Sequence, residues 1–215
     1  MLHYTAVNDL LKNSLLQVMK AEVFNDFRLV GGTALSLQIG HRESIDIDLF
    51  SDLEYGTINF NAIEIYLKEN FKYVDFLNTI PAIGKSYFIG DDKENTIKLD
   101  IYYTDNFIQP YLEVDGIRIA TIEEIIAMKV DIIQRGGRKK DFWDLHDLLQ
   151  SYDIGQMLDF HQQRYPYSHD TDLILHNFTS FDLADEDFNP ICFKGKHWEF
   201  IKEDFEETIL KYKNK

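Results

Sequence analysis

Apolar residues recur at helical spacing in several parts of the chain. The first such run consists of Val7, Leu10, Leu11, Leu15 and Val18. It predicts an amphipathic helix over residues 4–24, because apolar residues three and four positions apart share one face of a helix. Further helices are predicted over residues 33–39, 58–70, 121–135, 139–150, 153–163, 170–178 and 198–212. Gly40 is suited to end the helix predicted over residues 33–39. Gly136 and Gly137 separate the helix predicted over residues 121–135 from the one over residues 139–150.

Strand-like segments lie between the helices in the first part of the chain. They are predicted over residues 27–30, 44–50, 72–77, 86–90, 96–103 and 117–119. Beyond about residue 120 the pattern is helical, with an acidic loop at residues 182–187. We therefore expect an α/β (α+β) fold, in which residues 1–120 form a domain with a small mixed sheet flanked by helices. An α-helical C-terminal domain of residues 121–215 is expected to follow.

The composition is that of a globular protein. Of the 215 residues, 45% are hydrophobic and 14% are aromatic, which is enough for one large core or two small ones. The chain lacks a signal peptide pattern and an apolar run long enough to span a membrane, so we expect a cytoplasmic protein with no membrane association. The single cysteine, Cys192, excludes an intramolecular disulfide and a cysteine-rich zinc site.

The net charge of −15 and the isoelectric point near 4.8 argue against a general nucleic-acid binder. Such proteins neutralise phosphates with lysine and arginine over a broad surface. Contact with a nucleic acid would have to be local here. The basic residues available for it are Arg135, Arg138, Lys139 and Lys140, while Lys211, Lys213 and Lys215 are expected to lie at a solvated chain end.

Gly31, Gly32 and Thr33 stand between a predicted strand and a predicted helix. A helix N-terminus offers unpaired backbone N–H groups and the positive end of the helix dipole, which together favour an anion such as a polyphosphate. A Gly-Gly pair is also common in turns without any ligand. The segment lacks the spacing of a P-loop or a Rossmann fingerprint.

Asp46 and Asp48 are two residues apart on a predicted strand, so both carboxylates point to the same face. Two like charges side by side repel each other unless a cation lies between them. A divalent metal site is therefore our first hypothesis, and a solvated strand edge is the alternative.

Asp100 adds a third carboxylate on a second strand. Within residues 96–103, Lys98, Asp100 and Tyr102 share one face, and Ile97, Leu99 and Ile101 point to the core. Three carboxylates on neighbouring strands can hold two Mg²⁺ ions about 3.5–4 Å apart, an arrangement used for in-line displacement at phosphorus. The alternative for Asp100 is an exposed strand residue without a ligand.

Lys129 falls in the middle of an apolar helix face. On the helix predicted over residues 121–135, which opens with a capping box of Thr121 and Glu124, the apolar stripe consists of positions 122, 125, 126 and 133. A lysine there must either extend its amine to water or meet an anion, for which a β- or γ-phosphate is one candidate. Asp131 and Arg135 are four residues apart on the opposite face, where a surface ion pair is at least as well supported as a catalytic role.

Taken together, three segments resemble a known signature. Gly32-Thr33, twelve intervening residues, Asp46-Ile47-Asp48 and the later Asp100 resemble the motif of the polymerase-β type nucleotidyltransferase superfamily. Within it, the stretches GGTALSLQIGHRESIDIDLF, KLDIYY and MKVDIIQRGGRKKDFWDLHDLL are similar to the AbiEii/AbiGii family of abortive-infection toxins. The likeness extends through residues 157–198 and so covers nearly the whole chain.

The resemblance implies a nucleotidyltransferase fold and a role for each matching residue. Asp46 and Asp48 would bind two Mg²⁺ ions, or Mn²⁺ in their place, and Asp100 would bind one ion and help to deprotonate the attacking hydroxyl. Gly31, Gly32 and Thr33 would cradle the triphosphate of an NTP. The remaining matches are placed at an interdomain cleft, with Lys129 as a catalytic residue: Lys129, Asp131, Arg135, Lys140 and Asp141.

The function implied is that of the toxin in a toxin–antitoxin or abortive-infection pair, which transfers NMP from an NTP to an acceptor hydroxyl and releases pyrophosphate. A tRNA or other RNA end is one acceptor, but the acidic composition leaves a protein hydroxyl or a small molecule open. A cognate antitoxin is the expected partner. Two alternatives remain: a protein of the same fold that binds nucleotide and a partner without turnover, and a small-molecule enzyme similar to the aminoglycoside nucleotidyltransferases.

Overall fold

A computed structural model describes residues 1–77, 79 and 81–214 of the chain, and Lys215 of the basic tail lies outside them. The chain divides into two compact units. The first consists of residues 1–40 and 44–120, and the second of residues 41–43 and 121–215. The sequence pattern did not predict that the short segment His41–Glu43 belongs to the second unit.

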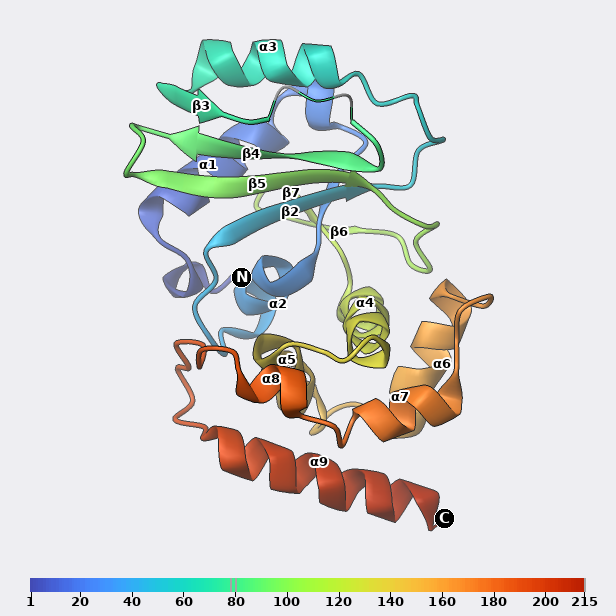
Figure 1. The fold of residues 1–215 in the computed structure, drawn as a ribbon. Coiled ribbons are helices and arrows are strands. Elements are labelled where there is room, and N and C mark those ends of the chain that lie inside the picture. Colours follow the sequence, from blue (N-terminus) through green and yellow to red (C-terminus); the bar gives the residue numbers. More distant parts are fainter. Residues whose placement is uncertain (78, 80, 215) are drawn as a thin grey trace. The chain divides into compact units, whose positions relative to one another are not determined.

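In the part of the first unit that the structure describes, a mixed seven-stranded sheet is accompanied by three α-helices (Figure 1). The strands follow one another across the sheet in the order β3-β4-β5-β2-β1-β7-β6. Their bounds are Arg28–Leu29 (β1), Asp46–Ser51 (β2), Tyr73–Asp75 (β3), Gly84–Gly90 (β4), Thr96–Tyr103 (β5), Leu112–Val114 (β6) and Ile117–Ile119 (β7). The helices are α1 (Asp9–Met19), α2 (Gly31–Ile39) and α3 (Phe60–Asn70). The expected α/β fold with a mixed sheet is therefore confirmed.

The central strands have two unlike faces. In β2 and β5 the residues that point to one side are almost fully buried: Ile47, Leu49, Ile97, Leu99 and Ile101. Helices α1 and α3 pack against this side of the sheet (Figure 1). The opposite side of the same strands carries half-buried polar and aromatic residues, so the alternation read from the sequence is observed.

Most elements of the first unit are present with bounds shifted by one or two residues, and two parts of this unit differ from the prediction by more than that. The helix predicted over residues 4–24 is divided into a 3₁₀ turn at Tyr4–Ala6, α1, and a second 3₁₀ turn at Glu22–Phe24. Asn8 caps the N-terminus of α1, because its side chain accepts a hydrogen bond from the Leu11 backbone N–H at 2.8 Å, so α1 begins after Asn8. Strand β6 was missed, although it forms a hairpin with β7 through Asp115 and Gly116, whose φ angles of 55° and 78° are those of a tight hairpin turn.

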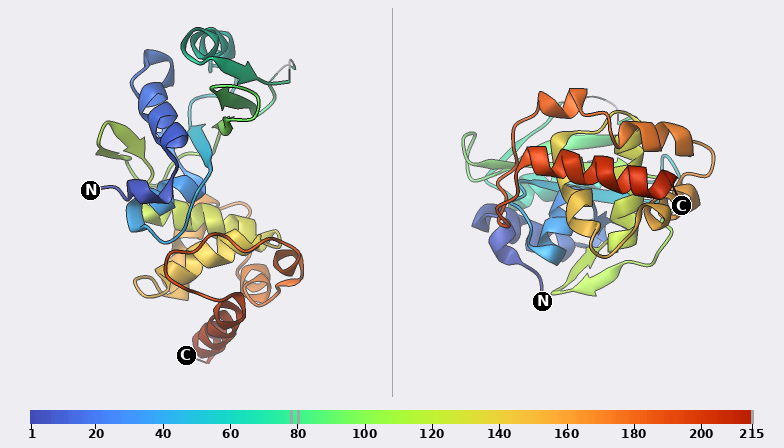
Figure 2. Two further views of the ribbon diagram at one scale, coloured as in Figure 1. Left: turned by 90° about the vertical axis from the view of Figure 1, so that its left-hand side faces the viewer. Right: turned by 90° about the horizontal axis from the view of Figure 1, so that it is seen from below.

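The second unit is helical, as expected. Its helices are α4 (Ile122–Gln134), α5 (Lys139–Leu148), α6 (Ile154–Arg164), α7 (Thr171–Asn177), α8 (Asp182–Asp185) and α9 (Trp198–Lys213). Helix α4 packs against α5, α6 and α7, and α9 runs across α5 and α6, as two directions of view show (Figures 1 and 2). The short helix α8 occupies part of the segment predicted as an acidic loop.

Buried ion pairs accompany the aromatic core of the second unit. Phe142 packs edge-to-face against the rings of Phe181, Trp198 and Phe205. The Thr121 side chain caps α4 by accepting from the Glu124 backbone N–H at 3.3 Å. The Glu124 carboxylate lies 2.5 Å from Nη1 of Arg164 on α6, and both side chains are fully buried.

Within the described residues, no helix combines the length and the apolar character needed to cross a membrane.

Candidate active site

The carboxylates predicted from the sequence meet on one face of the sheet. Strands β2 and β5 run parallel, with Asp48 opposite Asp100 and Asp46 opposite Lys98. Register partners on neighbouring strands point to the same side, so the three carboxylates and the lysine form a compact group. All four residues are half-buried. The parallel pairing therefore brings together residues that are more than fifty positions apart in the sequence.

Helix α2 begins directly beside this group. Gly31 has a φ of 70°, and a Cβ atom added to it would lie 2.6 Å from Oδ2 of Asp48. A glycine is required here on both counts. The Val30 backbone N–H donates to the carbonyl oxygen of Asp48 at 2.9 Å, which fixes the start of the helix at the strand.

Thr33 ties the same helix to the other end of the group. Its buried hydroxyl donates to the backbone carbonyl of Asp46 and lies 2.8 Å from Oγ of Ser44. The side chain therefore has an anchoring role in this structure. The backbone N–H groups of the first turn, from Gly31 to Thr33, remain the candidates for contact with phosphates.

Lys98 supplies the nearest positive charge to the three carboxylates. Lys98 and Asp100 are two residues apart and lie on the same face of β5. Nζ of Lys98 is 2.5 Å from Oδ2 of Asp100. Burial opposes the charged form of the lysine, but the hydrogen bond to Asp100 and the charges of Asp100, Asp46 and Asp48 outweigh burial and raise the pKa of Lys98. Three carboxylates placed this close together attract cations.

The carboxylates were predicted to hold metal ions. Among the described residues, no three Asp, Glu, His or Cys side chains are close enough together to form a metal site as they stand. The donor set is nevertheless suited to a hard divalent cation, because all three side chains offer oxygen ligands. Oδ1 of Asp100 is buried and has no hydrogen-bond partner in the described part of the chain, which leaves one oxygen of the set available.

Lys129 is buried in the second unit, where it meets two carboxylates of α5. It is 3% exposed, and its Nζ lies 2.5 Å from Oδ1 of Asp141 and 2.7 Å from Oδ2 of Asp144. Asp144 also accepts from Nε and Nη2 of Arg42, at 2.6 and 2.9 Å. His41 Nε2 lies 2.7 Å from the same carboxylate. We call these five residues the buried charge cluster.

The charges in this cluster stabilise one another. Burial alone would raise the pKa of Asp144, but Lys129 and Arg42 outweigh it and hold this pKa well below its ordinary value. For Lys129 the opposing effect is again burial, and Asp141 with Asp144 outweighs it and raises the lysine pKa. The sequence left two possibilities for Lys129, an amine extended to water or a contact with an anion, and in this structure Lys129 meets two protein carboxylates.

Three members of the cluster were missed as site residues: Asp144, Arg42 and His41. Asp144 follows Asp141 by three residues on a helix that also presents Phe142 and Leu145 to the core, so both carboxylates lie on or near an apolar face. That spacing was a usable signal. The contact of Arg42 and His41 with Asp144 spans more than a hundred residues, and no local pattern shows it.

Arg135 and Lys140 are not part of this cluster. Arg135 is exposed at the end of α4 and forms an ion pair with Asp131 one turn earlier, which is the surface pair considered from the sequence. Lys140 is half-buried in the first turn of α5. Arg138 contacts the cluster directly, because its Nε donates to Oδ2 of Asp141 at 2.9 Å.

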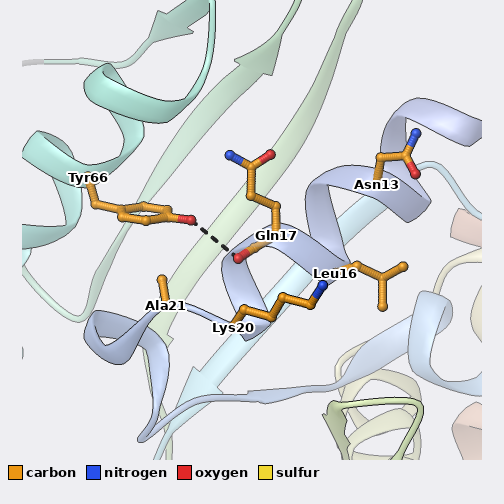
Figure 3. A pocket seen from close by; sticks show the side chains of 6 residues that line it. All are labelled: Asn13, Leu16, Gln17, Lys20, Ala21 and Tyr66. Carbon is orange, nitrogen blue, oxygen red and sulfur yellow. Dashed lines mark hydrogen bonds between the residues drawn. The ribbon is translucent and has the colours of Figure 1, made fainter.

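A cavity of about 520 Å³ lies elsewhere in the first unit. It is lined from α1, α3 and the segment after α1 (Figure 3): Asn13, Leu16, Gln17, Lys20, Ala21 and Tyr66. The Tyr66 hydroxyl donates to the Gln17 carbonyl at 3.2 Å across it. None of the predicted site residues lines this cavity, so we do not connect it with the carboxylates.

Comparison with known proteins identifies relatives of the whole chain. The family described as "Nucleotidyl transferase AbiEii toxin, Type IV TA system" matches residues 14–213. An uncharacterised protein of Aquifex aeolicus (strain VF5) is 26% identical over 216 residues, covering 94% of this chain and 95% of that protein.

Solved structures show the same fold. JHP933 from Helicobacter pylori has a TM-score of 0.59 at 22% identity, covering 98% of this chain and 92% of its own. MenT4, a nucleotidyltransferase toxin of Mycobacterium tuberculosis, has a TM-score of 0.54 at 12% identity, covering 91% of this chain and 79% of its own. At this level of identity the structural likeness concerns the fold, whereas the family match covers nearly every residue. The chain is a member of the AbiEii nucleotidyltransferase toxin family of type IV toxin–antitoxin systems.

Proposed function

We propose that this protein transfers the nucleoside monophosphate of an NTP to an acceptor hydroxyl in a reaction that depends on Mg²⁺. The observation that carries the proposal is the parallel register of β2 and β5, which sets Asp48 opposite Asp100 beside the first turn of α2. Carboxylate oxygens and a helix N-terminus, a feature suited to an anion, then occur at one place. This combination suits a nucleotide triphosphate.

In the proposed reaction each group has a stated part. The acceptor oxygen forms a bond to the α-phosphorus, the bond from that phosphorus to the oxygen bridging to the β-phosphate breaks, and pyrophosphate leaves. Asp100 Oδ1 accepts the proton of the attacking hydroxyl, for which its lack of a hydrogen-bond partner among the described residues leaves it available. The N–H groups at Gly31–Thr33 hold the departing phosphates.

Asp46, Asp48 and Asp100 would hold the divalent ions. Bound Mg²⁺ would neutralise the negative charge that develops on the phosphate oxygens. We assign Lys129 and Asp141 a role in holding the buried charge cluster together and not a direct contact with phosphate. The reason is that Lys129 already forms ion pairs with two buried carboxylates. Arg135 and Lys140 are retained as candidates for nucleotide contact. A cognate antitoxin is the partner that the family membership suggests.

The test is incubation of the purified protein with Mg²⁺, each α-³²P-labelled NTP in turn and total RNA. We expect wild type to label an acceptor and release pyrophosphate with at least one NTP. Asp46→Asn should abolish transfer and leave the melting temperature nearly unchanged, because the substitution removes a charge from a half-buried face without opening a cavity.

Asp159→Asn is the matched control, since Asp159 is exposed on α6 and no role in the reaction is assigned to it. It should transfer at the wild-type rate. Full activity of Asp46→Asn would contradict the assignment of the carboxylates. Transfer to protein or to a small molecule instead of RNA would keep the reaction type and change the acceptor.

A further inference from the structure

A row of polar side chains in the second unit ends at an exposed hydroxyl. Oγ1 of Thr171, the first residue of α7, lies 2.8 Å from Nε2 of His169 in the loop between α6 and α7 (Figure 1). Nδ1 of His169 lies 2.7 Å from Nδ1 of His161 on α6. Nε2 of His161 faces Oδ1 of Asp131 on α4 at 3.7 Å. We call these four residues the histidine relay.

The buried end of the relay fixes the direction of its hydrogen bonds. His161 is fully buried, and its Nε2 has no hydrogen-bond partner in the described part of the chain. The Asp131 carboxylate favours a proton on this nitrogen, because a bare lone pair would face a negative charge. A neutral imidazole has one donor and one acceptor nitrogen, so Nδ1 of His161 accepts the Nδ1 proton of His169. Nε2 of His169 is then the acceptor for the Thr171 hydroxyl.

The loop that carries His169 is anchored to α4. Gln134 donates to the Ser168 carbonyl at 2.8 Å and accepts from the Asp170 backbone N–H at 2.9 Å, so it binds both chain neighbours of His169. Burial and, to a smaller extent, the charge of His161 lower the pKa of His169 below its ordinary value. His169 is therefore both positioned and uncharged near pH 7, as a general base must be.

The Thr171 hydroxyl differs in its partner from other threonine hydroxyls of the chain. Those of Thr57 and Thr179 donate to backbone carbonyl oxygens at 2.7 and 3.1 Å, which do not take up a proton. Thr171 instead donates to a base that a third group orients, the arrangement by which proteins activate a hydroxyl as a nucleophile. Thr171 is also exposed, so an electrophile can reach its hydroxyl.

We propose that Thr171 is an acceptor for the protein's own nucleotidyl transfer, so that the protein attaches a nucleoside monophosphate to itself. This inference rests on the proposed function, in which an NTP is the electrophile. Oγ1 of Thr171 forms a bond to the α-phosphorus, the bond from that phosphorus to the oxygen bridging to the β-phosphate breaks, and pyrophosphate leaves. The hydroxyl proton moves to Nε2 of His169. His161 and the Asp131 carboxylate stabilise the positive charge that His169 gains.

The test is incubation of the purified protein with Mg²⁺ and each α-³²P-labelled NTP in turn, without RNA, followed by mass spectrometry of its peptides. We expect a nucleoside monophosphate on the peptide that contains Thr171. Thr171→Val removes the hydroxyl and should abolish this label, whereas Thr171→Ser keeps a hydroxyl and should be labelled. Thr179→Val is the matched control, because the Thr179 hydroxyl has no base as its partner, and it should be labelled like wild type.

His169→Gln tests the base separately from the acceptor. It should slow the labelling of Thr171 about 100-fold, which is the usual contribution of a general base. Asp46→Asn should abolish the label, because self-labelling uses the same transfer reaction. Labelling of His169→Gln at the wild-type rate would overturn the role of the histidine relay.

The remaining outcomes separate this inference from the proposed function. Unchanged labelling of Thr171→Val would overturn the inference. Labelling of Thr171 from a γ-³²P-labelled NTP and not from the α-labelled one would also overturn it, because the reaction would then be phosphorylation. Pyrophosphate release with label on RNA and none on the protein would overturn the inference and leave the proposed function intact. Absence of pyrophosphate release with every NTP would overturn both.

Discussion

Among single residues, Gly31 shows how local backbone geometry fixes the residue type at the candidate site. Its φ of 70° is in the left-handed region, and the space that a side chain would fill is occupied by the Asp48 carboxylate. Gly116 in the β6–β7 hairpin has a similar φ of 78°, but nothing lies within 4 Å of an added Cβ. Comparing an alanine substitution at each glycine therefore separates two contributions to the loss of stability: the strained backbone conformation and the steric clash.

Gly31→Ala should destabilise the protein more than Gly116→Ala. The alanine at position 116 pays only for the left-handed conformation, about 1 kcal/mol. The alanine at position 31 must also displace Asp48, so it should weaken nucleotide binding as well. Urea unfolding measures the first effect and equilibrium dialysis with NTP the second. Equal unfolding free energies for the two variants would contradict the close approach of Gly31 to Asp48.

At the residue scale the sequence predicted the strand face on which the three carboxylates lie. Alternation along a strand gives the face of Asp46, Asp48 and Asp100, because it is a local property. The partners of Lys129 could not be identified in the same way. Their choice depends on how α4, α5 and the segment His41–Glu43 pack together, which no spacing along the chain encodes.

Among the elements, α4 and α5 are joined by charge as well as by apolar packing. Lys129 on α4 bridges Asp141 and Asp144, which are one turn apart on α5. Removal of one partner from a buried ion pair is more damaging than replacement of the whole pair, since the remaining charge is left in a medium of low polarity.

Lys129→Met should destabilise the protein by about 3–5 kcal/mol. Because the folded-state pKa of Asp144 is depressed, its contribution to stability is present above the unfolded-state pKa of about 4 and is lost as the pH falls through the lower folded-state value. Without Lys129 this pKa rises, so acid unfolding should begin at a higher pH. Unfolding free energies measured from pH 3 to pH 7 check both statements.

Lys211→Met is the matched control for this substitution. Lys211 is exposed on α9, with its Nζ 2.9 Å from Glu207 one turn earlier. Its removal should change the unfolding free energy by about 0.5 kcal/mol or less. If Lys129→Met were as mild as this control across the pH range, the ion pairs of the buried charge cluster would not contribute to stability.

Strongly periodic elements were predicted closely. Strands β5 and β7 have the predicted bounds, and the second unit contains all five predicted helices. The errors fall where a short polar signal changes the backbone within a longer pattern. Asn8 restarts a helix inside an apolar run, and the Asp115-Gly116 turn marks a hairpin whose first strand carries no clear alternation.

Considered as a whole molecule, the chain has a discontinuous second unit. His41–Glu43 stands between α2 and β2 of the first unit, yet it packs with residues 121–215. Arg42 forms a bidentate contact with Asp144, and a bridge pairs it with Cys192. A substitution in the first fifth of the sequence should therefore affect the stability of a distant part of the chain.

Arg42→Leu should accelerate amide hydrogen exchange in α5 (Lys139–Leu148) and leave β2 and β5 protected as in wild type. The reason is that the substitution removes two hydrogen bonds from the buried Asp144 on α5. Peptide-resolved exchange with mass spectrometry makes the comparison within one sample, and the strand peptides are the internal control. Faster exchange in the strands with α5 unchanged would contradict the division into units.

The position of His41–Glu43 in the chain also sets an order of events during protein synthesis. Arg42 is made 102 residues before Asp144. Every residue of the first unit, up to Ala120, has therefore left the ribosome's catalytic centre before the partner of Arg42 exists. Domains generally fold as units while the chain is being made. The sheet can thus begin to form before α5 is made, whereas Arg42 and His41 gain their buried carboxylate partner only after Asp144 has been added to the chain.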